Sequence, residues 1–402
     1  MGKPKIRFEG YSEDWEQRKL DDVLKRRIEQ RQQSEEYPRL AFASGQGVIP
    51  LSERKTNNRE QLTKDEYTKK YLVTELNDIV YNPANVKYGA IDRNKCGRGV
   101  ISPIYVTFTT NEVPGFIERI VTSHDFQQRA LRFEEGTVTK RQSVNPEDLV
   151  ALDILVVPKR EEQQKIATYL DALDHVITLH QRKYDETKTL KKYMLQKMFP
   201  QNGEKVPEIR FDGFTEDWEQ RKLGDNIVEY TEKTTENNQY PVLTSSRKGI
   251  FFQTDYYDGN QIASADNTGY NIVPYGYFTY RHMSDDEIFH FNINDIAENG
   301  IVSTLYPVFT TDENLDSRYL QYQLNYGREF ARYAILQKQG GSRTYMYLNK
   351  LRNLYLTVPT AIEEQKKISE YFTNLDHLIT LHQRKCNELK EIKKYMLQNM
   401  FV

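Results

Sequence analysis

The chain contains one long stretch twice. Residues 161–200 (EEQQKIATYLDALDHVITLHQRKYDETKTLKKYMLQKMFP) and residues 363–402 (EEQKKISEYFTNLDHLITLHQRKCNELKEIKKYMLQNMFV) agree at 26 of 40 positions without a gap. Neither copy has an internal proline or glycine, and apolar residues recur at alternating spacings of four and three. This spacing is typical of a coiled-coil seam, so each copy predicts a helix of about 60 Å. A narrow seam of this length needs a partner, and the nearest one available is the other copy.

The predicted seam residues are those that face the partner helix in each heptad. They are Ile166, Leu170, Leu173, Ile177, His180, Tyr184 and Met194 in the first copy, and Ile368, Phe372, Leu375, Ile379, His382, Leu389 and Met396 in the second. His180 and His382 stand where Leu or Ile would be expected. We interpret them as a polar layer that fixes the register. A metal site is the alternative, but it would need further ligands that the seam does not offer.

The duplication covers nearly the whole chain. PKIRFEGYSEDWEQRKL (Pro4–Leu20) returns as PEIRFDGFTEDWEQRKL (Pro207–Leu223), and GVISPIYVTFTT from Gly99 answers GIVSTLYPVFTT from Gly300. Each unit has a Trp-bearing flank, a variable globular stretch and a long helix. A two-fold axis between such units would make the long helices antiparallel, with Ile166 towards Met396 and Met400 and the two histidines in the same or adjacent layers. The fold class predicted is α+β, with two pseudo-two-fold-related mixed α/β domains separated by an antiparallel two-helix coiled coil.

Local patterns give the predicted elements and boundaries. SEDWEQRKL reads as a short capped helix, and the variable stretches read as short strands with a few helices such as REQLTKDEYTKKYL and DSRYLQYQLNYGREFARYAI. The linker PQNGEKVPEIRFDG reads as a loop. The predicted parts are an N-terminal flank packing near the end of the second long helix (1–20), a first domain (21–160), a long helix (161–200), a linker and flank (201–223), a second domain (224–361) and a second long helix (362–402).

Composition limits the class of protein. A chain of 402 residues exceeds one ordinary core and has no apolar run of 18 residues, so we expect a multidomain protein without a membrane span. Cys96 and Cys386 lie far apart without metal-site spacing, which favours a reducing cytoplasm. The net charge of −2 requires any basic surface to be local.

The order of these motifs resembles the specificity subunit of Type I restriction–modification systems. The resemblance rests on the repeated flank, the variable stretch and the EEQ–LDH–HQRK–KKYMLQ helix, and it covers essentially the full chain. It implies that each globular stretch is a target-recognition domain for one half of a bipartite double-stranded DNA site. It also implies that the helices set the spacer and dock two methylation subunits, and that restriction/translocase subunits join the assembly.

The resemblance further implies a chain without catalysis of its own. S-adenosylmethionine, ATP and Mg would then belong to the partner subunits. The sequence agrees, since it has no P-loop motif and no HExxH pair. The nearest approach to the base-clamping loop of an adenine methyltransferase is Asn82-Pro83-Ala84-Asn85, which lacks the second proline and the aromatic residue. We interpret it as a turn of the kind that Asn-Pro favours.

Polar, basic, Gly-containing loops are the predicted DNA contacts, because glycine lets the backbone approach phosphates and Arg, Lys, Gln and Ser supply donors. Ordinary solvated loops are the alternative. The candidates in the first domain are Arg54, Lys55, Asn57, Asn58, Arg59, Arg93, Lys95, Arg98, Gly136, Thr139, Lys140, Arg141 and Gln142. Those in the second are Ser245, Ser246, Arg247, Lys248, Lys338, Gln339, Gly341, Ser342, Arg343 and Tyr345.

Two rival functions remain open at this point. A coiled-coil scaffold whose domains bind proteins would lack the steep salt dependence of phosphate neutralisation. A fused restriction–methylation polypeptide would need the catalytic motifs that are missing above.

Overall fold

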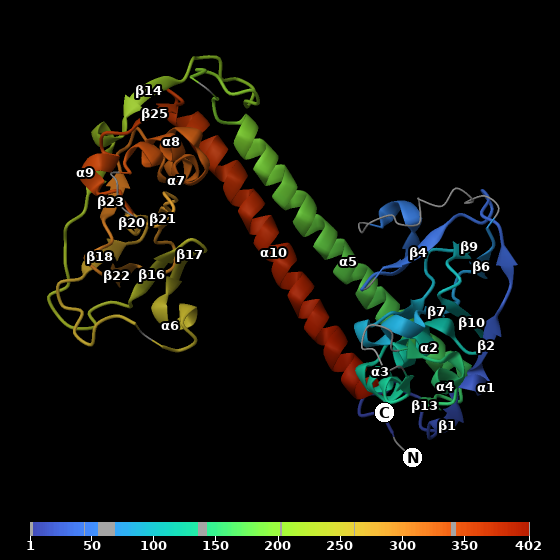
Figure 1. Ribbon diagram of the computed structural model, residues 1–402. Helices are drawn as coiled ribbons and strands as arrows, with labels where there is room; N and C mark the ends of the chain where they lie inside the picture. The colour runs from blue at the N-terminus through green and yellow to red at the C-terminus, as the bar shows by residue number, and fades with distance from the viewer. Residues whose placement is uncertain are drawn as a thin grey trace. The chain divides into compact units, whose positions relative to one another are not determined.

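The computed structural model describes residues 3–43, 45–54, 69–135, 143–201, 203–260, 262–338 and 343–401. The chain forms two compact units (Figure 1). Unit 1 comprises Met1–Gln181 and Arg384–Val402, and unit 2 comprises Arg182–Gln383. Each unit therefore contains a flank, a globular domain and one stretch from each long helix. Among the described residues, no helix combines the length and the apolarity that crossing a bilayer requires.

Unit 1 is built on an antiparallel four-stranded sheet of order β2-β10-β7-β8, accompanied by a three-stranded sheet, β3-β6-β9, and the hairpin β4-β5. Its elements are β1 (Glu16–Lys19), α1 (Leu20–Val23), β2 (Leu24–Arg27), β3 (Gln30–Arg31), β4 (Leu40–Ala43), β5 (Gly47–Pro50), η1 (Leu51–Glu53), β6 (Tyr71–Thr74), β7 (Ile79–Tyr81), η3 (Pro83–Tyr88), β8 (Ile91–Arg93), β9 (Gly99–Ile101), β10 (Val106–Thr110), α2 (Pro114–Val121), α3 (His124–Leu131), β11 (Glu134–Glu135), β12 (Ser143–Val144), α4 (Pro146–Val150) and β13 (Asp153–Val156).

Unit 2 repeats this plan with the four-stranded sheet β15-β23-β19-β21, the two-stranded sheet β18-β22 and the hairpin β16-β17. Its elements are β14 (Glu219–Lys222), η4 (Leu223–Asp225), β15 (Ile227–Glu229), β16 (Leu243–Ser246), β17 (Gly249–Phe252), α6 (Gln253–Tyr256), β18 (Asn271–Pro274), β19 (Phe278–Thr279), β20 (Met283–Ser284), β21 (Asn292–Ile293), β22 (Asn299–Val302), β23 (Val308–Thr311), α7 (Ser317–Tyr326), α8 (Arg328–Leu336), β24 (Thr344–Tyr345), α9 (Leu348–Leu351) and β25 (Tyr355–Val358).

The two long helices are α5 (Arg160–Lys197) and α10 (Ile362–Met400). Within each unit their stretches run side by side and antiparallel (Figure 1). In unit 1, Lys393 pairs with Asp174 and Ile166 shares a core with Met400. In unit 2, Lys191 Nζ lies 2.5 Å from Asp376 Oδ1. The coiled coil predicted from the seam and the antiparallel orientation predicted from the duplication are both confirmed within each unit.

The residues repeated in the sequence make the same contacts in both units. In unit 1 the guanidinium of Arg7 forms two hydrogen bonds, of 2.7 and 2.8 Å, with the buried carboxylate of Glu162. In unit 2, Arg210 and Glu364 form the same pair at the same distances. These ion pairs fix each Trp-bearing flank to the start of a long helix, and they explain why IRF and EEQ recur together.

The glutamine of each EEQ motif joins three elements. The side chain of Gln163 accepts a hydrogen bond from Val113 N at the start of α2 and donates one to Val157 O after β13. Gln365 accepts from Asp316 N before α7 and donates to Pro359 O after β25. Each glutamine therefore satisfies one free amide at a helix start and one free carbonyl at a strand end.

Each tryptophan lies at the centre of one core. Trp15 packs against Phe116 and Phe401 at centroid distances of 5.7 and 5.8 Å, and Trp218 packs against Phe199 and Tyr319 at 6.4 and 6.1 Å. Phe401 follows α10, whereas Trp15 lies near the start of the chain. The two ends of the chain accordingly meet in unit 1, where Ile6 N donates to Asn399 O.

Three local predictions differ from the structure. EQRK in SEDWEQRKL is the strand β1, which pairs with β13, because ladder pairing beside the buried Trp15 outweighs the helical capping signal. Of REQLTKDEYTKKYL, Tyr71 and Leu72 lie in strand β6, and residues 59–68 lie outside the described part. DSRYLQYQLNYGREFARYAI forms two helices, α7 and α8, separated at Gly327. The linker between α5 and β14 is a loop in its described residues, as predicted.

Candidate nucleic-acid interface

The predicted DNA contacts of unit 2 gather around one loop. Residues 285–287 follow β20 and carry three consecutive carboxylates, which we call the acidic loop. Arg343 Nε donates to Asp285 Oδ1 at 2.8 Å, and Arg247 Nη1 donates to Asp286 Oδ2 at 2.7 Å. Lys338 pairs with Glu287. Three cations from separate parts of the sequence are thus brought to one place.

These cations are accessible to a ligand. The side chains of Arg247, Lys338 and Arg343 are 55, 47 and 50 % exposed. Exposed ion pairs contribute only about 0–1 kcal/mol each, so a phosphate or a base edge can compete for the guanidinium and ammonium groups. The arrangement is therefore able to bind a polyanion.

A cavity of about 510 Å³ lies beside the acidic loop. The hairpin β16-β17 contributes Ser245, Ser246 and Arg247 to its wall, and the segment after β19 contributes Arg281 and Asp285. His290 also lines it, and burial, followed by the charge of Arg247, lowers the pKa of this imidazole. The cavity combines hydroxyl, guanidinium and carboxylate groups, which are the groups that read base edges.

Tyr345 belongs to a stack of rings next to these cations. Its ring lies 5.8 Å from that of Tyr347, which stacks on His282 at 4.9 Å. Tyr347 is 48 % exposed and Tyr345 36 %. Lys248, in the turn of the β16-β17 hairpin, is also exposed. An exposed aromatic surface bordered by cations suits contact with sugars and bases.

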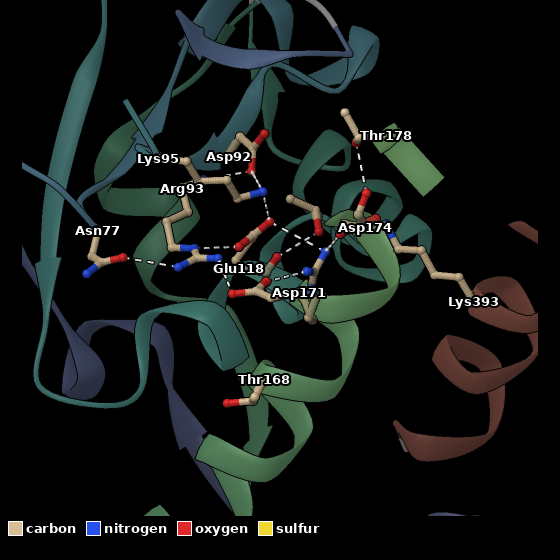
Figure 2. Close-up of polar contacts among 12 residues, drawn as sticks. Asn77, Asp92, Arg93, Lys95, Glu118, Thr168, Asp171, Asp174, Thr178 and Lys393 are labelled. Carbon is tan, nitrogen blue, oxygen red and sulfur yellow. Dashed lines mark hydrogen bonds and ion pairs between the residues drawn. The ribbon is translucent and has the colours of Figure 1, made fainter. Parts of the chain in front are cut away.

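In unit 1, Arg93 and Lys95 take part in a partly buried network of ion pairs (Figure 2). Arg93 donates to Glu118 at 2.6 Å and to Asp171 at 2.7 Å, and its third nitrogen donates to Asn77. Lys95 Nζ lies 2.5 Å from Glu118, whose side chain is 2 % exposed. This geometry gives Arg93 a structural role, because its three nitrogens are all engaged within the protein and the one that donates to Asp171 joins the domain to α5.

The network reaches both long helices through Arg119 and Asp174. Arg119 Nη1 lies 2.9 Å from Asp174, which also pairs with Lys393 of α10. Burial acts to raise the pKa of Asp174, but Lys393 and Arg119 outweigh it, so this pKa is lowered. In unit 2 a tyrosine replaces the arginine, since Tyr322 donates to Asp376 at 2.8 Å. The repeated LDH and KKYM motifs contain Asp174 and Lys393, but the other members of this network lie outside them, so the network was not predicted from the sequence.

The other predicted residues of unit 1 have different surroundings. Arg98 is 49 % exposed and pairs with Glu36 at 2.7 Å and with Glu75 at 3.0 Å. Arg54 is half-buried after η1. As DNA contacts, the residues of both units stay predictions. The candidates that lie outside the described residues are Lys55, Asn57, Asn58, Arg59, Gly136, Thr139, Lys140, Arg141, Gln142, Gln339, Gly341 and Ser342.

The Asn-Pro segment and the two seam histidines have local structural surroundings. Asn82 begins the 3₁₀ helix η3, and its side-chain oxygen accepts a hydrogen bond from Ala84 N at 3.1 Å, which is the arrangement of an Asn-Pro turn. His180 lies in the same seam layer as Cys386, and His382 in that of Tyr184, in the register set by the Asp174–Lys393 and Lys191–Asp376 pairs. No group of three or more His, Cys, Asp or Glu residues in the described ranges could hold a metal ion.

Comparison with known proteins gives the family. The model of the Type I restriction modification DNA specificity domain matches twice, at residues 12–189 and 215–391. The chain is also similar to a Type I restriction-modification S subunit from M. genitalium, with 13 % identity, a TM-score of 0.59 and coverage of 100 % of this chain and 99 % of that one. An HsdS subunit from Thermoanaerobacter tengcongensis matches with 16 % identity, a TM-score of 0.41 and coverage of 98 % of both chains.

The first of these structures supports the fold, and the two family matches include both globular domains and most of both long helices. Each copy is a DNA specificity domain, and the two copies account for the internal duplication. The chain belongs to the Type I restriction–modification DNA specificity family.

Proposed function

We propose that the two specificity domains read the two halves of one bipartite DNA target, separated by a non-specific spacer. The observation that supports this proposal is that the scaffold contacts repeat in both units while the corresponding hairpins differ. The β16-β17 turn carries Arg247 and Lys248, whereas the described part of the β4-β5 turn carries Gly45 and Gln46. Domains with one scaffold and different surfaces suit two different half-sites.

We further propose that α5 and α10 set the spacer and dock two methylation subunits. The long helices carry apolar side chains outside the seam, where a monomeric protein would expose polar ones. In unit 1, Leu179, Ile392 and Tyr395 are 46, 44 and 57 % exposed. Leu179 and Tyr395 occupy equivalent heptad positions, and Ile392 occupies the neighbouring heptad position on the same side of the seam. Such positions flank the same side of an antiparallel pair.

Unit 2 carries the corresponding surface. Leu190, Tyr193, Leu378 and Leu381 are 45, 48, 41 and 43 % exposed. They occupy the same heptad positions as the residues named for unit 1, with the contributions of α5 and α10 exchanged. One apolar stripe in each unit supports one methylation subunit per unit, two in all.

In this proposal the chain recognises DNA and catalyses nothing. The methylation subunits would supply S-adenosylmethionine chemistry, and restriction/translocase subunits would bring ATP and Mg to the assembled complex. This assignment is supported by the family and by the absence of P-loop and methyltransferase motifs from the sequence.

An arginine substitution tests DNA recognition. Arg343→Ala removes a group that we expect to contribute about 1–3 kcal/mol to a base contact. Releasing Arg343 from Asp285 costs about 0–1 kcal/mol of this, so we expect specific affinity to fall by about 1–2 kcal/mol. The measurement is DNA binding by the chain with its methylation partner. Arg182→Ala, which breaks an exposed ion pair with Glu186 on α5, is the matched control. Unchanged affinity in Arg343→Ala would remove this residue from the interface.

A further inference from the structure

The acidic loop occupies a position where the other unit has no negative charge. It lies between β19 and β21, the two strands that correspond to β7 and β8 in the four-stranded sheet of unit 1. The segment between β7 and β8 is NPANVKYGA, which contains a lysine and no carboxylate. The corresponding segment of unit 2 is YRHMSDDEIFHF. The three carboxylates are therefore a feature of the second domain and not of the common scaffold.

Hydrogen bonds of Ser284 stabilise the conformation of the loop. Ser284 Oγ lies 2.8 Å from both Asp286 Oδ1 and Ile288 O, which share its single proton, and it accepts a hydrogen bond from Asp286 N. Glu287 has a φ of 60°, in the left-handed region that favours glycine. A glutamate in this conformation costs about 1 kcal/mol relative to glycine. Strain of this kind is typical of a position at which the side chain has a function.

Each carboxylate of the loop holds a different cation. Asp285 binds Arg343, Asp286 binds Arg247, and Glu287 binds Lys338. Hydrogen bonds from Arg247, and then from Ser284, lower the pKa of Asp286, so this carboxylate is charged throughout the physiological range. A DNA phosphate that approaches these cations must displace a carboxylate from each of them.

We propose that Asp285, Asp286 and Glu287 are specificity-determining residues of the second domain, which hold its three cations away from DNA phosphates until the target bases replace them. The proposal rests on the proposed function of the domain. It explains the arrangement physically, because non-specific binding depends almost entirely on phosphate neutralisation. A carboxylate next to a cation reduces this contribution on every sequence. On the target sequence, hydrogen bonds to base edges compensate for the weakened phosphate contacts, since carboxylates accept hydrogen bonds from the cytosine N4 amino group and arginines donate to guanine.

The consequence is a larger ratio of specific to non-specific affinity. Three exposed ion pairs, each contributing a few tenths of a kcal/mol, lower non-specific affinity by about tenfold. The cognate site regains this free energy through the base contacts. The acidic loop thus increases discrimination without requiring tighter binding to the target.

Neutralisation of the loop tests the proposal. The variant carries Asp285→Asn, Asp286→Asn and Glu287→Gln in the full chain with its methylation partner. The control carries Asp217→Asn, Glu236→Gln and Glu363→Gln. These three exposed residues of unit 2 form no ion pair among the described residues, and their neutralisation changes the net charge by the same amount. The first probe is a DNA duplex that carries the target sequence, identified as the site that the complex methylates. The second is the same duplex with only the half read by the second domain scrambled.

We expect the variant to bind the scrambled duplex about tenfold more tightly than the wild type does, with a smaller change on the target duplex. The control should leave the ratio of the two affinities unchanged. A variant ratio equal to that of the wild type, or a change that the control reproduces, would overturn the role of the loop. A wild type that does not distinguish the two duplexes would instead refute the proposed function of the second domain.

Discussion

The ion pair between Arg7 and Glu162 offers a direct test of how the chain is held together. Arg7→Met removes the guanidinium and leaves a carboxylate whose side chain is 0 % exposed. Glu162→Gln removes the carboxylate and leaves a guanidinium that is 13 % exposed. Arg7→Met removes both hydrogen bonds to Glu162 and the one to Glu13 O, whereas the amide oxygen introduced by Glu162→Gln can still accept one hydrogen bond from Arg7. The groups left behind also differ in their access to water.

The expected loss of unfolding free energy in each variant follows from this difference in exposure. Breaking a fully buried pair costs about 3–5 kcal/mol, mostly because the remaining charge has lost its partner. Arg7 belongs to a terminal flank and retains some exposure, so it can turn towards water when Glu162 is neutralised. We therefore expect Glu162→Gln to destabilise unit 1 by about 1–2 kcal/mol, and Arg7→Met by about 3 kcal/mol. The variant that loses the cation should be the less stable of the two.

Denaturant unfolding followed by tryptophan fluorescence measures this effect, since each unit contains one tryptophan in its core. Trp15 reports on unit 1 in a Trp218→Phe background, and Trp218 reports on unit 2 in a Trp15→Phe background. Arg210→Met, at the equivalent pair of unit 2, is the matched control and should destabilise only the unit that Trp218 reports. Equal effects of Arg7→Met and Glu162→Gln, or effects below about 0.5 kcal/mol, would refute the reasoning from burial.

Two further predictions concern the helices and the cavity. The double variant Leu179→Glu and Ile392→Glu places charge on the apolar stripe of unit 1, so it should reduce the assembly from two methylation subunits per chain to one, as measured by native mass spectrometry. Thr178→Glu on the same helix is the control. A double variant that still binds both subunits would contradict the proposed docking surface. The lowered pKa of His290 means that the unfolded chain binds its proton at a higher pH than the folded chain does, so this residue makes stability fall as the pH drops below about 6.5. His290→Gln should reduce the loss of unfolding free energy between pH 7.5 and 5.5, and an unchanged loss would show that the imidazole is not desolvated.

Much of the scaffold was predictable because its contacts join residues that the sequence repeats. The seam spacing predicted the long helices, and the two-fold relation expected between the repeated units predicted their antiparallel pairing. The repeat also contained the Arg7–Glu162 pair and its equivalent in unit 2, although only the structure shows that these residues meet. Strand β1 was not predictable from its own residues, since EQRK has no apolar alternation and forms a strand through pairing with β13.

The candidate interface was predictable only in part. The basic loops of unit 2 stood out by composition, and the structure brings Arg247, Lys338 and Arg343 to one loop. The acidic loop was missed because SDDE resembles any solvated turn, and only tertiary structure reveals that each carboxylate faces a different cation. Arg93 shows the opposite case, since this predicted loop residue is the last residue of strand β8 and its guanidinium binds carboxylates within the protein.

The central claim is that each specificity domain reads one half of the target independently. Exchanging residues 21–158 for the corresponding domain of another family member, followed by methylome sequencing of cells that also carry the methylation partner, tests it most directly. The account predicts that one half of the methylated site changes while the other half and the spacer length stay the same. A change in both halves, or in neither, would contradict it.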